Sequence, residues 1–476
     1  MEYEAVIGME VHVEINSDSK VFCACSTNFH ADANTNVCPI CLGMPGTLPV
    51  LNRDMVEKSV AVGLALNCTV SRWSKMDRKN YFYPDLAKNY QISQYDLPLS
   101  HSGHLDIEVK GKSKRIGITR AHMEEDTARN THTLGGGHSG VDFNRSSVPL
   151  LEIVTEPDIN SADEGYAYLT ALKQCLEYLG VSDCNMEEGS LRAEANISVR
   201  PKGQKELGTK TEVKNVASFS GTQKAIEFEI KRQVKLLNDG GAVVQETRGW
   251  DADRGITVSQ RQKESAHDYR YFPEPDLMPI VVDEAWEQRI HKSLPELPAP
   301  RKKRFQSDYG LSAYDTEVLC ATRAMADYFE GVVQGGADSK KAANWIMGDL
   351  QARLLDAKEE IDACKITPQH LAEMIALIDE GTISGKIAKD LLGDMLATGK
   401  APKALVEAKG LVQISDSGEL EGIVQQILAV NPAQVEQYKG GNEKIIGFLM
   451  GQVMKATQGK ANPKMATDAL RKALNS

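Results

Sequence analysis

The sequence contains no apolar run long enough to cross a membrane. A spanning helix needs roughly 18 consecutive apolar residues, and VAVGLAL at 60–66 is among the longest runs present. The N-terminal stretch MEYEAVIGMEVHVEI carries acids where a secretory signal would carry Lys or Arg. We therefore expect a soluble, cytoplasmic protein with no membrane partner.

Low-complexity tracts and convincing internal repeats are also missing, which argues against fibrous and repeat architectures. Hydrophobic residues make up 41% and charged residues 25% of the 476 positions, and this composition is ordinary for globular proteins. A chain of this length suggests about three domains.

The common nucleotide-binding motifs are absent as well. The sequence has neither GxxxxGK[ST] nor a GxGxxG that follows a strand. The nearest glycine-rich stretch, 135–137 in THTLGGGHSG, lacks the Lys-Ser/Thr that should follow, and we interpret it as a flexible loop. No Ser-His-Asp or Cys-His arrangement can be assigned from spacing. Any ATP bound by this chain is therefore not held by a P-loop.

The net charge of −11 argues at first against nucleic acid, because phosphate binding depends on Lys and Arg. However, residues 438–476 contain seven basic and two acidic residues, a local charge of +5, which leaves −16 on residues 1–437. Phosphate contacts depend on local charge. A nucleic acid would thus be held by the C-terminal tail.

The proline-rich segment SLPELPAP at 293–300 separates two regions with different patterns of hydrophobic residues. Before it, short alternating runs predict half-buried strands, interrupted by helices at 53–66, 161–179 and 220–238. After it, the alternation stops, and amphipathic helices are predicted at 313–333, 338–356, 368–380 and 384–398. We predict an α+β fold with three domains: a large mixed or antiparallel sheet domain (1–292), an all-α domain (293–404) and a small helical tail (405–476).

Three predicted strands each bring carboxylates to a polar face. In IGMEVHVEI (7–15), alternation places Glu10 and His12 on the face opposite the apolar residues. In LRAEANISV (191–199), Arg192 and Glu194 share the polar face, and in GTKTEVKNV (208–216) one side carries Lys210, Glu212 and Lys214. Such strands belong to an antiparallel or mixed sheet with one wet face. For any single strand, a solvated surface is the simpler interpretation.

A run of acids at His122-Met-Glu124-Glu125-Asp126 favours a functional interpretation of these faces. Neighbouring residues of a strand point in opposite directions, so only one of Glu124 and Glu125 can share a cleft with Glu10. Gathered carboxylates need a cation to remain ionised, and Mg²⁺ prefers oxygen ligands of this kind. Lys210, Lys214 and Arg192 are then candidates for pairing with phosphate oxygens, which makes a metal-nucleotide cleft a coherent hypothesis.

Four of the nine cysteines lie within 19 residues, as Cys23-x-Cys25-x12-Cys38-x2-Cys41. A CxC pair and a CxxC pair can place four thiolates tetrahedrally around Zn²⁺, and such a closed site is structural. Reduced structural thiols and a redox CxxC pair remain as alternatives. We expect zinc to fix the loop 23–41 between the first strand and the helix at 53–66.

Two aromatic-proline clusters, DRKNYFYPD at 77–85 and DYRYFPEPD at 268–276, are dense in Tyr, Arg and acids. They predict either a binding wall or a well-packed loop, and the sequence does not decide between the two.

Several long blocks of this sequence resemble one family. The blocks are IGMEVHVEI, DRKNYFYPDLAKNYQISQYD, GITRAHMEEDTAR, NRSSVPLLEIVTEPDI, MEEGSLRAEANISVR, GTKTEVKNVASF, DYRYFPEPDL, NWIMGDL, TISGKIAK and FLMGQVMKATQGKANP. Together they resemble the B subunit of the aspartyl/glutamyl-tRNA amidotransferases, the GatB family, over essentially the whole chain.

The resemblance implies a fold and an activity. The fold would be a cradle similar to the glutamine synthetase and guanido kinase class, followed by a helical domain and a YqeY-like tail that grips tRNA. The activity would use ATP and Mg²⁺ to phosphorylate the side-chain carboxylate of Glu on tRNA(Gln) or of Asp on tRNA(Asn). Ammonia from an amidase partner, the A subunit, would then displace phosphate, in a heterotrimeric complex that also contains the small C subunit.

The resemblance also implies site residues. It points to His12, Glu125 and Glu212 as Mg²⁺ ligands, with Glu10 and Glu124 close by, and to Glu125 over Glu124 as the direct ligand. Lys79 and Arg192 would contact phosphate or the aminoacyl end, and the zinc cysteines would not be catalytic. In the tail, the expected tRNA-binding residues are Lys444, Lys455, Lys460 and Lys464.

Two other functions fit parts of the sequence. A stand-alone small-molecule carboxylate-amine ligase would share the acidic cleft but would have no need of a basic tail. A zinc-stabilised tRNA-binding adaptor without catalysis would have no reason to keep Glu10, His12, Glu125 and Glu212 together.

Overall fold

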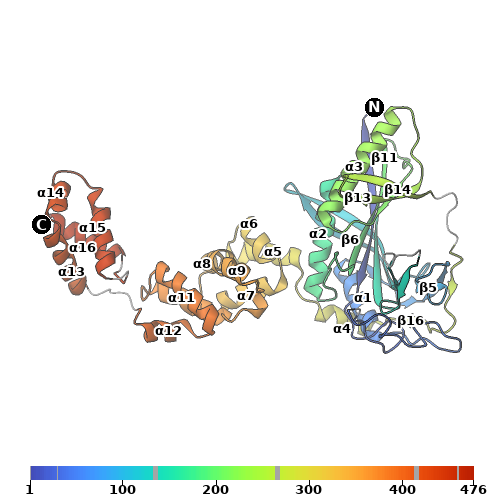
Figure 1. Cartoon of the computed structure of the whole chain (residues 1–476), viewed down its shortest axis with the longest axis horizontal. Helices are drawn as coiled ribbons and strands as arrows, with labels where there is room; N and C mark the ends of the chain where they lie inside the picture. Colours follow the sequence, from blue (N-terminus) through green and yellow to red (C-terminus); the bar gives the residue numbers. More distant parts are fainter. Residues whose placement is uncertain are drawn as a thin grey trace. The chain divides into compact units, whose positions relative to one another are not determined.

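The computed structural model describes residues 2–28, 30–131, 138–262, 269–411, 417–457, 460–461 and 463–475. The chain divides into two compact units, Met1–Leu297 and Pro298–Ser476 (Figure 1). In the first unit a large sheet is packed against helices, and the second unit is helical. Among the described residues, no helix is both long and apolar enough to cross a membrane.

A nine-stranded sheet forms the centre of the first unit, within the described residues. Its neighbours are antiparallel except for one parallel pair, β12 and β13. In spatial order the strands are β14 (Ile256–Gln262), β13 (Glu246–Asp251), β12 (Thr211–Lys214), β11 (Leu191–Pro201), β1 (Tyr3–Glu14), β10 (Pro149–Thr155), β7 (Lys112–Glu125), β6 (Ser100–Val109) and β2 (Thr69–Val70).

One face of this sheet carries the apolar core. Alternation along β1 buries Ile7, Met9, Val11 and Val13 completely, as the sequence predicted. Against this face pack α1 (Arg53–Ala65), α2 (Ala162–Leu179) and α3 (Phe219–Asn238). Each of these helices begins at a polar cap, at Asn52, Ser161 and Ser218 respectively, whose side chain accepts from backbone N–H groups of the first turn.

Among the described residues, the first unit also contains three small sheets and a fourth helix. The three-stranded sheet lies beside the end of β7, because β5 hydrogen-bonds to Glu124 and Glu125. The predicted flexible loop at 135–137 lies outside the described residues. These elements are the sheet β15 (Phe272–Pro273), β4 (Asp77–Asn80) and β5 (Tyr90–Ser93), the pair β16 (Ile280–Val281) and β3 (Trp73–Ser74), the pair β8 (Arg129–Thr131) and β9 (Gly140–Asp142), and α4 (Glu284–Ser293).

In the described part of the second unit there are two separate apolar clusters, one from residues 305–406 and one from residues 420–474. Its helices are α5 (Pro298–Tyr309), α6 (Ala313–Leu319), α7 (Arg323–Gln334), α8 (Ser339–Trp345), α9 (Gln351–Ala357), α10 (Pro368–Asp379), α11 (Gly385–Thr398), α12 (Pro402–Lys409), α13 (Ser417–Val430), α14 (Pro432–Lys439), α15 (Ile445–Ala456) and α16 (Pro463–Asn475).

Two predicted helices of this unit are interrupted in the structure. The segment 313–333 forms α6 and α7, because Thr322 is in an extended conformation and its side chain caps Met325 N at the start of α7. The segment 338–356 forms α8 and α9, which are joined by the π-helical turn Ile346–Leu350. The amphipathic pattern runs through both interruptions, so it does not reveal them.

Candidate active site

The polar face of the large sheet gathers six ligand-type side chains from five adjacent strands. Strand β1 contributes two of them, Glu10 and His12, which are two residues apart and therefore share a face. Across the strand pairs, His12 lies opposite Glu152 of β10, and Glu10 lies opposite Glu194 of β11. The six residues form two groups of three, each with potential ligand atoms within 4.8 Å of one another.

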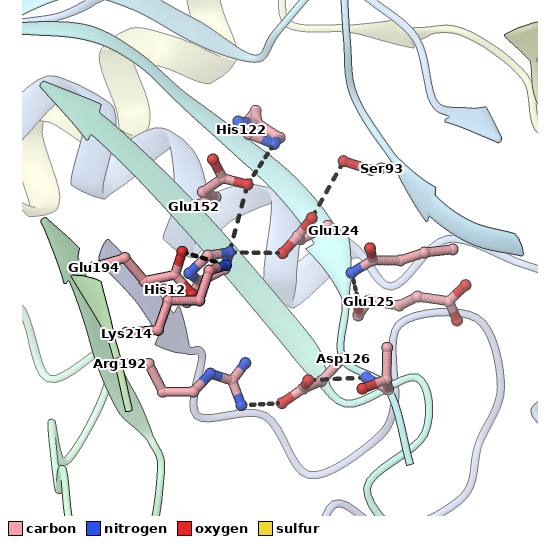
Figure 2. A network of polar contacts seen from close by, with 12 residues as sticks. His12, Ser93, His122, Glu124, Glu125, Asp126, Glu152, Arg192, Glu194 and Lys214 are labelled. Atoms are coloured by element: carbon pink, nitrogen blue, oxygen red, sulfur yellow. Dashed lines mark hydrogen bonds and ion pairs between the residues drawn. The ribbon is translucent and has the colours of Figure 1, made fainter. Parts of the chain in front are cut away.

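The first group, the histidine triad, consists of His12, Glu124 and Glu152. The Nε2 atom of His12 lies 3.4 Å from Oε1 of Glu124 and 3.5 Å from Oε2 of Glu152. Around these three, His122 Nε2 is 3.3 Å from Glu152, and Ser93 Oγ donates to Glu124 at 3.3 Å. Figure 2 shows the three side chains converging from β1, β7 and β10.

The histidine triad is largely withdrawn from water. Glu124 is 2% exposed and Glu152 7% exposed, so this part of the polar face is covered and is not the open wet surface that alternation predicted. Burial raises the pKa of Glu124, whereas the pKa of Glu152 is held far below its usual range by His122 and His12, against the effect of burial. Burial also opposes the charged form of His12, but the hydrogen bond to Glu152 and the nearby carboxylates raise its pKa to about 10. The carboxylates of the histidine triad therefore stabilise a positive charge placed among them.

The second group, the carboxylate triad, consists of Glu10, Glu194 and Glu212. Asn196 Nδ2 donates to Glu10 at 2.9 Å, and Thr247 Oγ1 donates to Glu212 at 2.6 Å. Burial and then the carboxylates of Glu152, Glu194 and Glu212 raise the pKa of Glu10. Three acids held this close favour a bound cation, because their mutual repulsion otherwise opposes ionisation.

Lys214 is the cation of the carboxylate triad, with Nζ 2.7 Å from Glu194 and 3.3 Å from Glu212. Lys210, which we expected on the same side, comes directly before β12 and is exposed. Arg192 lies opposite His12, but its guanidinium pairs with Asp126 at 3.0 Å.

The structure differs from our expectation for the adjacent acids. Glu124, and not Glu125, lies beside His12, and Figure 2 shows the Glu125 carboxylate directed away from the triad. Glu125 accepts from Lys88 Nζ at 2.7 Å, from Ile92 N at 2.8 Å and from Ser147 Oγ. The reason is strand parity, because Glu125 shares a face of β7 with buried Met123.

Lys79 of β4 lies opposite Gln91 of β5 and beside the aromatic segments. Its Nζ is 5.1 Å from the ring centroid of Tyr269. Burial would lower the pKa of Lys79, but the carboxylates of Glu124 and Glu152, together with nearby tyrosines, outweigh burial and raise it. Lys79 is therefore charged and close to the metal-type ligands.

Sequence reasoning missed Glu152 and His122, and it placed Glu194 on a polar face without selecting it as a ligand. A signal for Glu152 was present, since it is the only charged residue in the buried strand PLLEIVT. A charge kept in such a strand needs a partner. Which partner it meets depends on β10 pairing between β1 and β7, which no local pattern reveals.

The four cysteines meet as the spacing predicted. The Sγ atoms of Cys23, Cys25, Cys38 and Cys41 all lie within 4.8 Å of one another. A tetrahedral ion with Zn–S bonds of about 2.3 Å needs sulfurs roughly 3.8 Å apart, and the Cys38–Cys41 pair is at 3.9 Å. This cluster is therefore suited to binding a metal.

The tail lysines lie at the surface of the second unit. Lys444, Lys455 and Lys464 are exposed and Lys460 is half-buried. They lie on or beside α15 and α16, whose apolar sides form the core of residues 420–474.

Comparison with known proteins gives the family. Residues 5–288 match the family described as the GatB/GatE catalytic domain, and residues 327–474 match the family described as the GatB domain. A protein of Carboxydothermus hydrogenoformans is 55% identical over 473 residues, covering 99% of this chain and 98% of the relative. A protein of Caldanaerobacter subterraneus is 56% identical over 475 residues, covering 100% of both chains.

Both relatives are named as the B subunit of aspartyl/glutamyl-tRNA(Asn/Gln) amidotransferase. A Geobacter sulfurreducens protein with the same name is 55% identical over 478 residues, covering 100% of both chains. The resemblance seen in the sequence is thus confirmed along the full length. The chain belongs to the GatB family.

Proposed function

We propose that this chain is the B subunit of a glutamine-hydrolysing aspartyl/glutamyl-tRNA(Asn/Gln) amidotransferase. It phosphorylates the side-chain carboxylate of Glu on tRNA(Gln), or of Asp on tRNA(Asn), and amidates it with ammonia. The observation that carries the proposal is the pair of triads on one sheet face, in a chain whose relatives bear this name.

The chemistry explains why such a face is needed. A carboxylate is a poor electrophile, because its leaving group would be oxide, and conversion to an acyl phosphate removes this obstacle. Phosphoryl transfer then depends on alignment and on neutralising the charge of the phosphates. When bound, Mg²⁺ would supply that neutralisation.

The residues present fit Mg²⁺. Two groups of oxygen and imidazole ligands converge, and the raised pKa of Glu10 reflects the crowding of carboxylates that a cation relieves. The histidine triad would hold one ion and the carboxylate triad a second, while Glu125 stays with Lys88 and does not bind the metal. Thr247 and Asn196 orient their carboxylates, as outer partners of metal ligands commonly do.

Three cations would act on the anionic substrates. Lys79, beside the histidine triad, is placed to contact a phosphate. Lys214 pairs with both Glu194 and Glu212 of the carboxylate triad. Phosphate oxygens bound at that triad would therefore lie within its reach. Arg192, already paired with Asp126, would orient the aminoacyl end.

The remaining parts have supporting roles. The cysteine cluster would hold a structural Zn²⁺ that fixes the loop after β1. The first 292 residues would form a cradle similar to the glutamine synthetase and guanido kinase class, with residues 293–404 as a helical domain. Residues 405–476 would be a YqeY-like tail that grips tRNA, and the A and C subunits would complete a cytoplasmic complex.

The test is conversion of Glu-tRNA(Gln) with Mg²⁺, ATP and free ammonium, comparing the chain alone with the assembled complex. We expect the complex to form Gln-tRNA(Gln) only when both Mg²⁺ and ATP are present. Product formed without ATP would contradict a phosphorylation step. With glutamine in place of ammonium, the chain alone should give no product, and robust glutaminase activity in it would contradict the division of labour.

A further inference from the structure

Two aromatic segments far apart in the sequence form one continuous tyrosine wall in the structure. The wall consists of Tyr81 of the segment 77–85, Tyr95 further along the same stretch of chain, and Tyr269 and Tyr271 of the segment 268–276. Tyr95 and Tyr271 are stacked, with ring centroids 4.3 Å apart and planes at 6°. The edge-to-face pairs Tyr269–Tyr271 (6.0 Å) and Tyr81–Tyr269 (5.8 Å) continue the row.

At one end of the wall an aromatic ring, that of Tyr95, is exposed to solvent. Tyr95 is 61% exposed although Tyr271 covers one of its faces. A stacked pair that ends in an exposed ring offers its outer face to a third planar ring, and every nucleobase has such a face.

The backbone under the wall is held firmly. Arg78 makes a bidentate pair with Glu274, at 2.6 and 2.7 Å, which ties β4 to the segment after β15. Asn80 Nδ2 donates to Arg270 O at 2.9 Å, and Tyr95 N donates to Asp77 Oδ2 at 3.1 Å. The exposed ring is therefore presented on an ordered support, which lowers the entropy cost of binding a ligand.

The wall adjoins the histidine triad. Ser93, two residues before Tyr95, donates to Glu124 at 3.3 Å. Lys79 has its Nζ 5.1 Å from the Tyr269 ring, and it lies opposite Gln91, whose side chain donates to the backbone carbonyl of Glu125. The histidine triad, Lys79 and the tyrosine wall are therefore close neighbours.

We infer that the outer face of Tyr95 stacks against the adenine ring of ATP, with the phosphates extending past Lys79 to the histidine triad. The acids and the lysine suit the metal-bound phosphates of a nucleotide, and the aromatic rings suit its base. Stacking alone accepts any base, so the wall supplies affinity and placement. The inference rests on the proposed function, because it assigns the nucleotide of that same site.

The experiment measures equilibrium binding of Mg²⁺-ATP and of Mg²⁺-tripolyphosphate, which lacks the base, to the full chain. We expect Tyr95→Ala to weaken ATP binding at least about tenfold and to leave tripolyphosphate binding unchanged. Tyr95→Phe keeps the ring and should bind ATP within about twofold of the unmodified chain. Tyr314→Ala, at a tyrosine of the second unit that is 74% exposed, is the matched control and should change neither.

Each other outcome overturns the inference. Unchanged ATP binding in Tyr95→Ala excludes stacking, and equal loss of tripolyphosphate indicates damage to the metal site. A short RNA ending in CCA is the second arm. Loss of its binding with unchanged ATP binding would assign the wall to the acceptor end of tRNA. If the unmodified chain and the assembled complex bind neither ATP nor tripolyphosphate, the proposed function itself fails. That result is seen without any substitution at Tyr95, so it is distinct from failure of the stacking inference.

Discussion

At the scale of single residues, Glu212 is held by a neutral hydrogen-bond donor as well as by Lys214. Thr247 Oγ1 donates to Glu212 at 2.6 Å from the adjacent strand β13. Thr247→Val keeps the shape but removes the donor, so we expect Mn²⁺ or Mg²⁺ affinity to fall on the order of tenfold. Titration calorimetry of the full chain measures this, and Thr247→Ser should restore binding. Equal metal affinity in the Val and Ser variants would show that the hydrogen bond has no role in positioning Glu212.

Glu125 also supports a prediction at this scale, because its partner Lys88 is buried with it. The side chains of Lys88 and Glu125 are 12% and 3% exposed. Lys88→Met leaves a buried carboxylate without its cation, and we expect a loss of about 3 kcal/mol in the free energy of unfolding, measured by urea titration. The exposed pair Lys110–Asp163 is the control, and Lys110→Met should leave the urea midpoint unchanged. An unchanged midpoint for Lys88→Met would mean that Glu125 is stabilised by Ser147 and Ile92 N alone.

Alternation predicted the polar positions of Glu10, His12 and Glu194 correctly, because it is a local property of a strand. The same rule, applied to His122, Met123 and Glu124, would have favoured Glu124, since Met123 marks the apolar face. The motif resemblance outweighed it and favoured Glu125. Glu152 needed the neighbour relation between β1 and β10, which are more than a hundred residues apart in the chain.

At the scale of elements, the cysteine loop is the segment whose order depends most on a bound metal. Residues 15–52 between β1 and α1 contain no long helix or strand among the positions that the structure describes. We expect a chelator to raise hydrogen exchange in this loop before it affects the strands of the large sheet. Mass spectrometry of peptides measures this order.

A matched pair of variants tests the same loop. Cys38→Ser should lower zinc stoichiometry and the unfolding temperature, whereas Cys364→Ser, at a half-buried cysteine outside the cluster, should retain the metal. Exchange that rises first in the sheet would contradict a local structural role.

Helices and strands were predictable where a pattern is local and strong. The expected helices at 53–66, 161–179 and 220–238 correspond to α1, α2 and α3. The break between α6 and α7 was not expected. The extended conformation of Thr322 interrupts the helix, but the spacing of apolar residues continues through it. The parallel pairing of β12 and β13 is also a long-range property that their sequences do not encode individually.

At the scale of the whole molecule, charge is divided between an acidic body and a basic tail. The net −11 combines +5 over residues 438–476 with −16 over the rest. The net charge alone would argue against a nucleic-acid partner, and the local count removes that objection.

The tail lysines give the corresponding prediction. The triple variant Lys444→Glu, Lys455→Glu and Lys464→Glu should weaken tRNA binding and reduce its salt dependence by roughly one unit of slope for each phosphate contact that the variant removes. Filter binding over a range of salt concentrations measures this, and Mg²⁺-ATP binding serves as the internal control. An unchanged salt slope would show that tRNA is held elsewhere.

The most direct test concerns Glu152, which is buried between His12 and His122. Phosphate release from Mg²⁺-ATP in the presence of Glu-tRNA(Gln) is measured for the assembled complex carrying Glu152→Gln, with exposed Glu206→Gln as control. We predict a fall on the order of 100-fold for Glu152→Gln, retained tRNA binding, and no change for Glu206→Gln. Phosphate release at the normal rate in Glu152→Gln would contradict the assignment of the histidine triad to catalysis.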